Sequence, residues 1–412
     1  MPNDAGKRTA VVLSGGGAYG AYEVGVLKAL FGGKSPATGG AALDPDIFVG
    51  TSVGGFNAAV LAMNKGGATG SIAHLESIWK DHVADKDDGR GNGVYRIRGN
   101  PLDYFDPRLP ATPMAQLERL IADTTTLGKA AVPRVLHFFS PEARLLHRME
   151  GLVDISAFLN IDPFCHLVES MVEPATLRKS GKVLRVMATA WVTGDAQDFD
   201  FPRMTDEATW AAIRASAAIP GLFPPVKLWN ETFIDGGVVQ NTPIRPAVEQ
   251  GATEIHVVSL NPNMAKLPES HIENTLDTFN RVYTAMLASN VAEDVESARW
   301  INDGLEVLER IDAGEDLNSD TMSRFVRVAG IIYRKLRGEG KLPSALTIHR
   351  YYPDKSLGDT FGMLNFHQNA IDSMIQDGYE NAVAHDCQAN DCVIAAPAAL
   401  GKLAASAAGQ SD

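Results

Sequence analysis

The chain has 412 residues, a length that fits one large domain with appended elements better than one small core. Hydrophobic residues make up 45% of the sequence and charged residues 21%, which is ordinary for a folded enzyme and excludes a largely disordered chain. The formal net charge of −13 repels nucleic acid and anionic lipid, so we expect no nucleic-acid partner. Any contact with a membrane has to use local apolar surface or a partner protein.

The first part of the chain predicts two consecutive strand–turn–helix units. Arg8–Ser14 is a β-rich segment that runs into three glycines, and Gly20–Leu30 then carries apolar residues at helical spacing. After a loop rich in glycine and proline, Ile47–Gly50 is the second expected strand and Gly54–Met63 the second helix. Two such units in a row predict a mostly parallel sheet covered by helices.

The rest of the chain predicts an insertion, further sheet elements and a helical extension. Residues 80–182 are irregular and are expected to form a helical insertion that walls a site. Four elements should follow: a strand at 182–193, a helix at 208–218, a hairpin of 227–229 with 232–234, and a buried strand at 254–260. We therefore expect a three-layer α/β/α sandwich over residues 8–260, a mainly helical region over 261–385 and a low-complexity tail over 386–412.

Gly50-Thr51-Ser52-Val53-Gly54 is a G-x-S-x-G motif between an expected strand and an expected helix. A nucleophilic serine in this position projects from a sharp turn, and small residues two before and two after it avoid clashes. The following helix directs its positive end at the reacting oxygen. The motif alone is common, but this context makes Ser52 a candidate nucleophile, with Gly50 and Gly54 as the small residues of its turn.

Ser14-Gly15-Gly16-Gly17-Ala18-Tyr19-Gly20 follows the first expected strand. Consecutive glycines at a strand end can direct several backbone N–H groups at one developing oxyanion. Gly15, Gly17 and Gly20 also satisfy the dinucleotide-binding pattern G-x-G-x-x-G, which requires an acidic residue at the end of the next strand. Asp44 and Asp46 precede that strand instead, so the oxyanion interpretation is preferred.

Phe233-Ile234-Asp235-Gly236-Gly237 ends the expected hairpin with an accessible aspartate. An Asp-Gly-Gly sequence elsewhere is usually only a turn. If Ser52, the glycine loop and Asp235 all lie at carboxyl ends of strands, they meet at the edge where open α/β sheets bind ligands.

These three motifs, in this order, resemble the patatin-like phospholipase family, as do Ala215–Val226 and Val238–Pro246. The resemblance covers roughly residues 8–260 and implies Ser52 as nucleophile, Asp235 as its dyad partner, and the N–H groups of Gly15, Gly16 and Gly17 as the oxyanion hole. Many bacterial relatives carry a basic residue where this chain has Tyr19, so cationic help at that position is not expected.

The resemblance implies hydrolysis of fatty-acyl esters, with phospholipids or lysophospholipids as the favoured lipid substrates. The residues themselves indicate only an acyl ester or thioester, so a neutral-lipid, polyester or thioester hydrolase is an alternative. A non-catalytic lipid-binding or regulatory protein on the same fold is another, although all three catalytic features are intact. The rival mechanism is a Ser–His–Asp triad, for which His256, His349 and His367 are candidates; the dyad is preferred.

The cysteines and the N-terminal residues indicate the compartment. Cys165, Cys387 and Cys392 do not form a disulfide framework. The last two, next to His385, could bind a metal, but the sequence offers no second ligand pair, so free thiols are preferred and no metal or other cofactor is expected. Residues 1–10 are polar and lack a secretory signal, which predicts a cytoplasmic protein, with peripheral membrane contact left open.

Overall fold

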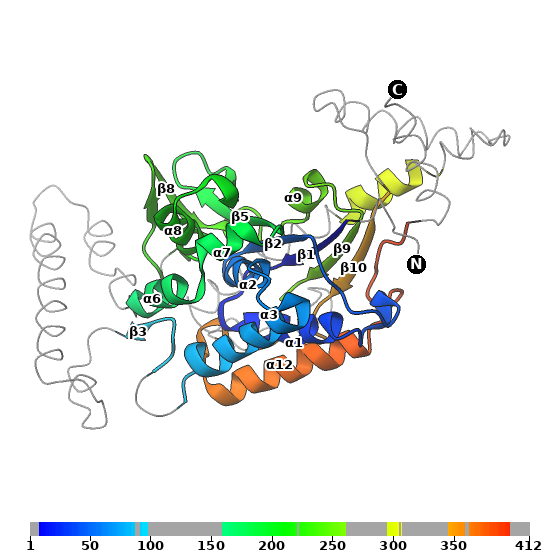
Figure 1. The fold of residues 1–412 in the computed structure, drawn as a ribbon, viewed down its shortest axis with the longest axis horizontal. Helices are drawn as coiled ribbons and strands as arrows, with labels where there is room; N and C mark the ends of the chain where they lie inside the picture. The colour runs from blue at the N-terminus through cyan, green and yellow to red at the C-terminus, as the bar shows by residue number, and fades with distance from the viewer. Residues whose placement is uncertain are drawn as a thin grey trace, which may run out of the picture.

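The computed structural model describes residues 8–86, 91–97, 159–220, 222–260, 295–304, 306, 345–358 and 362–395. Within these residues a central sheet of eight strands dominates the fold (Figure 1). In order of hydrogen bonding the strands are β10-β9-β1-β2-β5-β8-β7, and β6 also pairs with β5. Their bounds are β1 Thr9–Leu13, β2 Ile47–Thr51, β5 Val183–Ala190, β6 Ala196–Asp200, β7 Val226–Leu228, β8 Glu231–Asp235, β9 Glu254–Val258 and β10 Thr347–Tyr351.

The sheet is mostly parallel on one side and antiparallel on the other. β10, β9, β1, β2 and β5 pair in parallel, whereas β6 and β8 run antiparallel to β5, and β7 forms a hairpin with β8. The first two strands are short, and all their residues except Thr9 are buried, as expected for strands covered on both faces.

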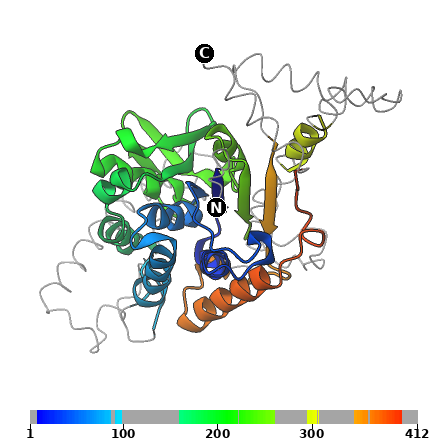
Figure 2. The same cartoon turned by 45° about the vertical axis from the view of Figure 1, so that its right-hand side comes forward.

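Side chains of alternate residues along β1 enter different layers, because successive side chains of a strand point to opposite faces. Val11 and Leu13 belong to a core shared with helices α1, α2, α3, α8 and α12. Ala10 and Val12 belong to a second core with α9 and with the helical segment over 295–304. Figures 1 and 2 show helices on both sides of the sheet, so the predicted α/β/α sandwich is confirmed. The helices are α1 Gly20–Phe31, α2 Val53–Ala62, α3 Gly67–Ile78, α6 Asp162–Met171, α7 Pro174–Lys179, α8 Asp206–Ser216, α9 Ile244–Glu249 and α12 Gln368–Val383.

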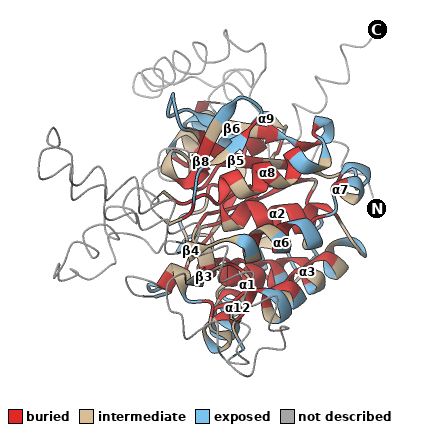
Figure 3. Cartoon of the chain, turned by 90° about the vertical axis from the view of Figure 1, so that its left-hand side faces the viewer, coloured by how far each residue is buried: buried red, intermediate tan, exposed pale blue. Residues whose placement is uncertain are grey.

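Helices α1 and α12 pack backbone against backbone. A Cβ atom on Gly25 would lie 1.9 Å from the carbonyl oxygen of Ile375, and one on Gly378 would lie 2.1 Å from that of Tyr22. Glycine at these two positions therefore allows the close approach. Eleven of the twelve residues of α1 are buried, and the helix lies within the red interior of Figure 3. Helix α12 is thus packed closely against α1, the helix that follows the glycine loop.

The C-terminal part of the chain contributes to the sheet, which the sequence analysis did not anticipate. β10 pairs in parallel with β9, so the sheet continues beyond the predicted boundary at residue 260. The predicted tail also begins with ordered structure, because Val393 forms a bridge with Ile348 of β10. Most of the expected insertion and of the expected helices after residue 260 lies outside the described residues. None of the helices that the structure describes has the length and hydrophobicity needed to span a membrane.

Candidate active site

Ser52 occupies a strained turn between β2 and α2. Its backbone has φ 55° and ψ −125°, an unusual conformation for a non-glycine residue. A Cβ atom on Gly50 would lie 2.3 Å from the carbonyl oxygen of Gly54, and one on Gly54 would lie 2.5 Å from that of Leu13. The two small residues expected around the serine are therefore required sterically. This arrangement has the form of a nucleophile elbow.

A second serine holds this turn in place. The backbone N–H of Ser52 donates a 2.8 Å hydrogen bond to Oγ of Ser216, the last residue of α8. Ser216 is fully buried, and its partner is only 4% exposed. No motif in the sequence indicated this role for Ser216, although it lies in the segment Ala215–Val226 that carries part of the family resemblance.

Asp235 reaches Ser52 through the antiparallel part of the sheet. Thr51 at the end of β2 pairs with Met187 of β5, and Asp235 at the end of β8 pairs with the next residue, Ala188. Because β6 occupies the opposite edge of β5 at the same residues, β2 and β8 share one edge and meet end to end there. Asp235 lies at the carboxyl end of β8, as expected, but β8 runs opposite to β2, so the two strands bring Asp235 and Ser52 together from opposite directions.

Asp235 is nearly completely buried, with 1% of its surface exposed. Its Oδ1 accepts a 2.7 Å hydrogen bond from the N–H of Gly237. Burial raises the pKa of Asp235 to about 7, and hydrogen bonding from Ser52 and Gly237 lowers it in part. Among the described residues, Oδ2 has no partner of ordinary hydrogen-bond geometry. Ser52 thus lies near enough to Asp235 to lower its pKa, although Oδ2 of Asp235 has no hydrogen bond of ordinary geometry.

The glycine loop lies beside the nucleophile and is fixed by Asn241. A Cβ atom on Gly15 would lie 3.0 Å from that of Ser52. The N–H of Gly15 donates to the side-chain oxygen of Asn241 at 3.1 Å, and the amide nitrogen of Asn241 donates to the carbonyl oxygen of Gly15 at 3.2 Å. The predicted oxyanion donor at Gly15 is thus already engaged. Within the described residues, the N–H groups of Gly16 and Gly17 donate to no protein acceptor.

Gly17 is constrained more tightly than its neighbours in the loop. Its φ is +59°, a left-handed conformation that favours glycine. A Cβ atom there would lie 2.3 Å from the carbonyl oxygen of Met363, in the short helical turn η9 (Gly362–Leu364). The C-terminal part of the chain therefore covers the loop, which the sequence did not reveal.

A buried polar network supports the helix that follows the loop. Asn57 of α2 donates to the carboxyl group of Glu23 at 2.8 Å and to the carbonyl oxygen of Gly20 at 3.2 Å. Trp79 donates in turn to Asn57 at 2.9 Å. Burial raises the pKa of Glu23 well above its usual value, so this carboxyl group favours its neutral form.

The three candidate triad histidines are engaged elsewhere. His256 of β9 is fully buried, and its ring nitrogens lie 3.2 Å from the hydroxyl of Tyr351 and 3.2 Å from the carboxylate of Glu254. His349 of β10 lies 3.5 Å from the sulfur of Cys387. His367 caps α12 by accepting a hydrogen bond from the N–H of Asn369. These contacts favour the dyad over the triad.

The chain is similar in sequence to several known proteins. Lysophospholipase NTE1 of Cryptococcus neoformans var. neoformans serotype D is 26% identical over 161 residues, which cover 33% of this chain and 10% of that protein. Triacylglycerol lipase 4 of Saccharomyces cerevisiae is 23% identical over 297 residues, which cover 63% of this chain and 25% of the lipase. Probable lipid hydrolase 463L of Invertebrate iridescent virus 6 is 37% identical over 71 residues, covering 17% of this chain and 24% of the viral protein. The chain thus spans a quarter or less of the length of these curated relatives.

The chain also matches the sequence model of a whole protein family. The sequence model of that family, described as patatin-like phospholipase, matches residues 11–248 and so includes the glycine loop, the serine elbow and the Asp-Gly-Gly segment. These are the motifs that form the site described above. The chain belongs to the patatin-like phospholipase family.

Proposed function

We propose that this protein hydrolyses fatty-acyl esters with a Ser52–Asp235 dyad. The observation that carries the proposal is a buried aspartate with a pKa of about 7 beside a serine in a strained strand–helix turn. A base is most effective when its pKa lies near the working pH, and an ordinary aspartate at about 3.9 is too weak. Burial thus turns Asp235 into a base suited to neutral pH.

The first step forms an acyl-enzyme. Oγ of Ser52 attacks the ester carbonyl carbon while its proton passes to Asp235. The negative charge on the carbonyl oxygen is stabilised by the N–H groups of Gly16 and Gly17 and by the N-terminus of α2. The tetrahedral intermediate collapses, the carbon–oxygen bond to the alcohol breaks, and the departing oxygen takes the proton from Asp235.

The second step regenerates the enzyme by the same route. Water gives a proton to Asp235 and attacks the acyl carbon, and the bond to Oγ of Ser52 then breaks. The fatty acid leaves, and the proton returns to the serine oxygen. In both steps Asp235 accepts a proton from the attacking oxygen and returns it to the departing oxygen. The dyad therefore needs no further acid or base.

The favoured substrates are phospholipids or lysophospholipids, in keeping with the family and with the name of the fungal relative. Neutral glycerides are the second candidate, because two yeast relatives named triacylglycerol lipases match over nearly two thirds of this chain. Lysophosphatidylcholine, dioleoylphosphatidylcholine and trioleoylglycerol should be supplied in the same detergent micelles. Mass spectrometry of the released acids and alcohols, with S52A as the blank, then ranks the classes.

A serine-directed fluorophosphonate probe tests the dyad itself. The wild-type protein should be labelled at Ser52, and both S52A and D235N should lose labelling and ester hydrolysis. H367N keeps a side chain able to cap α12 and should retain activity. A folded wild-type protein whose Ser52 stays unlabelled would favour the non-catalytic lipid-binding alternative. Loss of activity in folded H367N or H256Q would instead favour a triad.

Lipid substrates are met at a surface, and an exposed apolar patch suits that contact. Trp191, Val192 and Trp229 are 59%, 88% and 66% exposed. The N–H of Trp191 donates a 2.8 Å hydrogen bond to the carbonyl oxygen of Thr232, which brings the β5–β6 turn beside the β7–β8 hairpin. Tryptophan partitions favourably into the interface between lipid and water. We infer that this tryptophan patch (residues 191, 192 and 229) contacts lipid transiently.

A further inference from the structure

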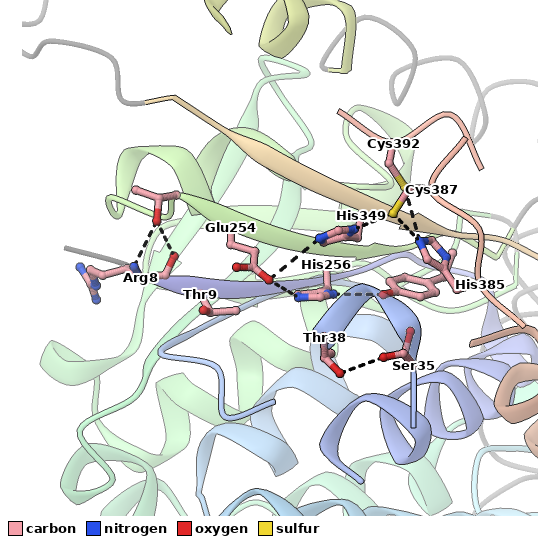
Figure 4. Close-up of polar contacts among 12 residues, drawn as sticks. Arg8, Thr9, Ser35, Thr38, Glu254, His256, His349, His385, Cys387 and Cys392 are labelled. Carbon is pink, nitrogen blue, oxygen red and sulfur yellow. Dashed lines mark hydrogen bonds and ion pairs between the residues drawn. The ribbon is translucent and has the colours of Figure 1, made fainter. Parts of the chain in front are cut away.

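A cluster of two histidines and two cysteines lies where α12, β10 and the last described segment meet. His349 belongs to β10, His385 follows the end of α12, and Cys387 and Cys392 lie on the turn that leads to the bridge with β10 (Figure 4). One potential ligand atom from each of the four residues lies within 4.8 Å of the other three. Both histidines are buried and both cysteines are half-buried, so the group is shielded from bulk water.

The spacing of these atoms fits one tetrahedral metal ion. Zinc binds cysteine sulfur at about 2.3 Å and histidine nitrogen at about 2.0–2.1 Å, so a tetrahedron places such sulfur and nitrogen atoms about 3.6 Å apart. The sulfur of Cys387 lies 3.5 Å from Nδ1 of His349 and 3.5 Å from Nε2 of His385. The sulfur of Cys392 lies 3.6 Å from the same Nε2. We propose that His349, His385, Cys387 and Cys392 bind a structural zinc ion.

The choice of zinc follows from the ligands. Two thiolates and two imidazoles in a tetrahedron suit zinc, whereas magnesium and calcium prefer oxygen ligands. Four protein ligands leave no open position for water or substrate, which is typical of a structural site. α12 is 16 residues long, about 24 Å at 1.5 Å per residue. Its N-terminal end follows the turn that covers the glycine loop, and its C-terminal end leads to the cluster, so the ion serves stability and not the ester chemistry.

The surroundings contain groups that can orient the ligands. Nε2 of His349 lies 4.0 Å from the carboxylate of Glu254, the kind of partner that aligns a metal-bound imidazole. The backbone N–H of Arg350 donates a 3.3 Å hydrogen bond to the sulfur of Cys392. The side-chain nitrogen of Asn390 lies 3.0 Å from Nδ1 of His385. Binding through Nε2 leaves a proton on Nδ1, so Asn390 must turn its amide to present oxygen there, which gives up the 2.9 Å hydrogen bond from its nitrogen to the carbonyl oxygen of Arg350.

The fourth ligand, His349, lies far from the other three in the sequence. His385, Cys387 and Cys392 are close in the chain, but His349 comes from a strand 36 residues before the first of them. It joins the cluster because β10 is the outermost strand of the described sheet and the segment after α12 returns to it. The ion would fasten that strand to α12, and the proposal replaces the expectation of free thiols.

Metal analysis of the full chain tests the site without relying on activity. Wild-type protein, purified without a polyhistidine tag or chelator, should contain about one zinc per chain by elemental analysis. The zinc content of the double variant C387S/C392S should be at least about tenfold lower than that of wild type. C165S is the matched control, because Cys165 is half-buried on α6 outside the cluster, and its zinc content should not change. Equal zinc in the double variant and wild type would overturn the proposal.

A second measurement uses the wild-type chain alone. It therefore tests the zinc site even if the double variant does not fold. Chelator-treated protein titrated with cobalt chloride should develop the visible bands of tetrahedral cobalt with thiolate ligands at about one equivalent. Added zinc chloride should abolish these bands and protect two of the three thiols from a thiol-specific reagent. Folded protein that binds neither ion, or that carries a disulfide between Cys387 and Cys392, would contradict the site.

Discussion

Asn241 and Gly15 are joined by a pair of hydrogen bonds, one in each direction, between the asparagine side chain and the glycine backbone. The backbone carbonyl of Asn241 also accepts from the N–H of Gly15, at 3.3 Å. This pairing connects the segment after Asp235 to the loop that faces Ser52. The orientation of the remaining loop N–H groups therefore depends on a residue that performs no chemistry itself.

Replacing Asn241 should damage catalysis more than folding. N241A removes both side-chain contacts with Gly15, and a displaced oxyanion loop should lower kcat/KM roughly tenfold to a hundredfold. Steady-state hydrolysis of a soluble p-nitrophenyl ester measures this loss. Q240A is the control, since only the backbone carbonyl of Gln240 holds Thr51. Equal activity in both variants would show that the loop keeps its shape without Asn241.

Gly17 should tolerate a side chain less well than Gly39, although both have a left-handed backbone. Their φ angles are +59° and +61°, but a Cβ atom on Gly17 would lie 2.3 Å from the carbonyl oxygen of Met363, whereas nothing lies within 4 Å of one on Gly39. G39A should therefore cost only the conformational penalty of about 1–2 kcal/mol. G17A should cost more and also lose ester hydrolysis. Urea unfolding of the two variants makes the comparison, and equal destabilisation would argue against the contact with Met363.

The rate should follow the ionisation of Asp235. The base acts only when deprotonated, and its pKa is about 7, so kcat/KM should rise about tenfold per pH unit below pH 7 and level off above it. Circular dichroism over the same range must show a folded protein throughout. A rate that stays constant from pH 5 to pH 8 would mean that Asp235 ionises near its ordinary value, and the proposed source of its basicity would fail.

The same carboxyl group should make the protein less stable as pH rises. Burial raises its pKa from 3.8 in the unfolded chain to about 7 in the folded one, so the folded state holds the proton more tightly between these values. The contribution of this carboxyl group to stability is fullest below pH 3.8 and falls by on the order of 4 kcal/mol up to pH 7. D235N lacks this ionisation. Denaturant unfolding should find D235N more stable than wild type at pH 8, with the difference shrinking toward pH 4, while Glu23 contributes equally to both proteins.

The parts of the site that depend on local sequence could be predicted, and those that depend on distant strand pairing could not. Ser52 and Gly17 belong to short motifs in which adjacent residues determine the backbone conformation, so the sequence indicated both. The position of Asp235 depends on where β2 stops along β5, because only there can β8 use the same edge. Likewise, Asn241 and Ser216 are polar residues without a distinctive pattern, and their partners lie 226 and 164 residues away.

The fold follows the same division. Burial makes β1 and β2 short, mainly apolar segments, each followed by a motif with glycines, so they were predictable from the sequence. β10 has a similar length, but Ile348 is the only aliphatic residue among its five, so its sequence does not resemble that of a buried strand. Nearly ninety residues separate β10 from its partner β9, and most of them lie outside the described part of the chain. Only the tertiary structure could identify it.

Removing the tryptophan patch should weaken binding to lipid surfaces without changing hydrolysis of a soluble ester. In an S52A background, which keeps vesicles intact, W191S/W229N should lower the affinity for phosphatidylcholine vesicles at least about tenfold, because each exposed tryptophan loses apolar area to bury. Asparagine suits the left-handed backbone of Trp229.

W300S is the matched control, since Trp300 is 42% exposed on the separate helical segment over 295–304. Added salt should have little effect, because a chain with net charge −13 gains no electrostatic attraction to a zwitterionic surface. If W300S weakens sedimentation with vesicles as much as the double variant does, the contact is not localised at the β5–β6 and β7–β8 turns.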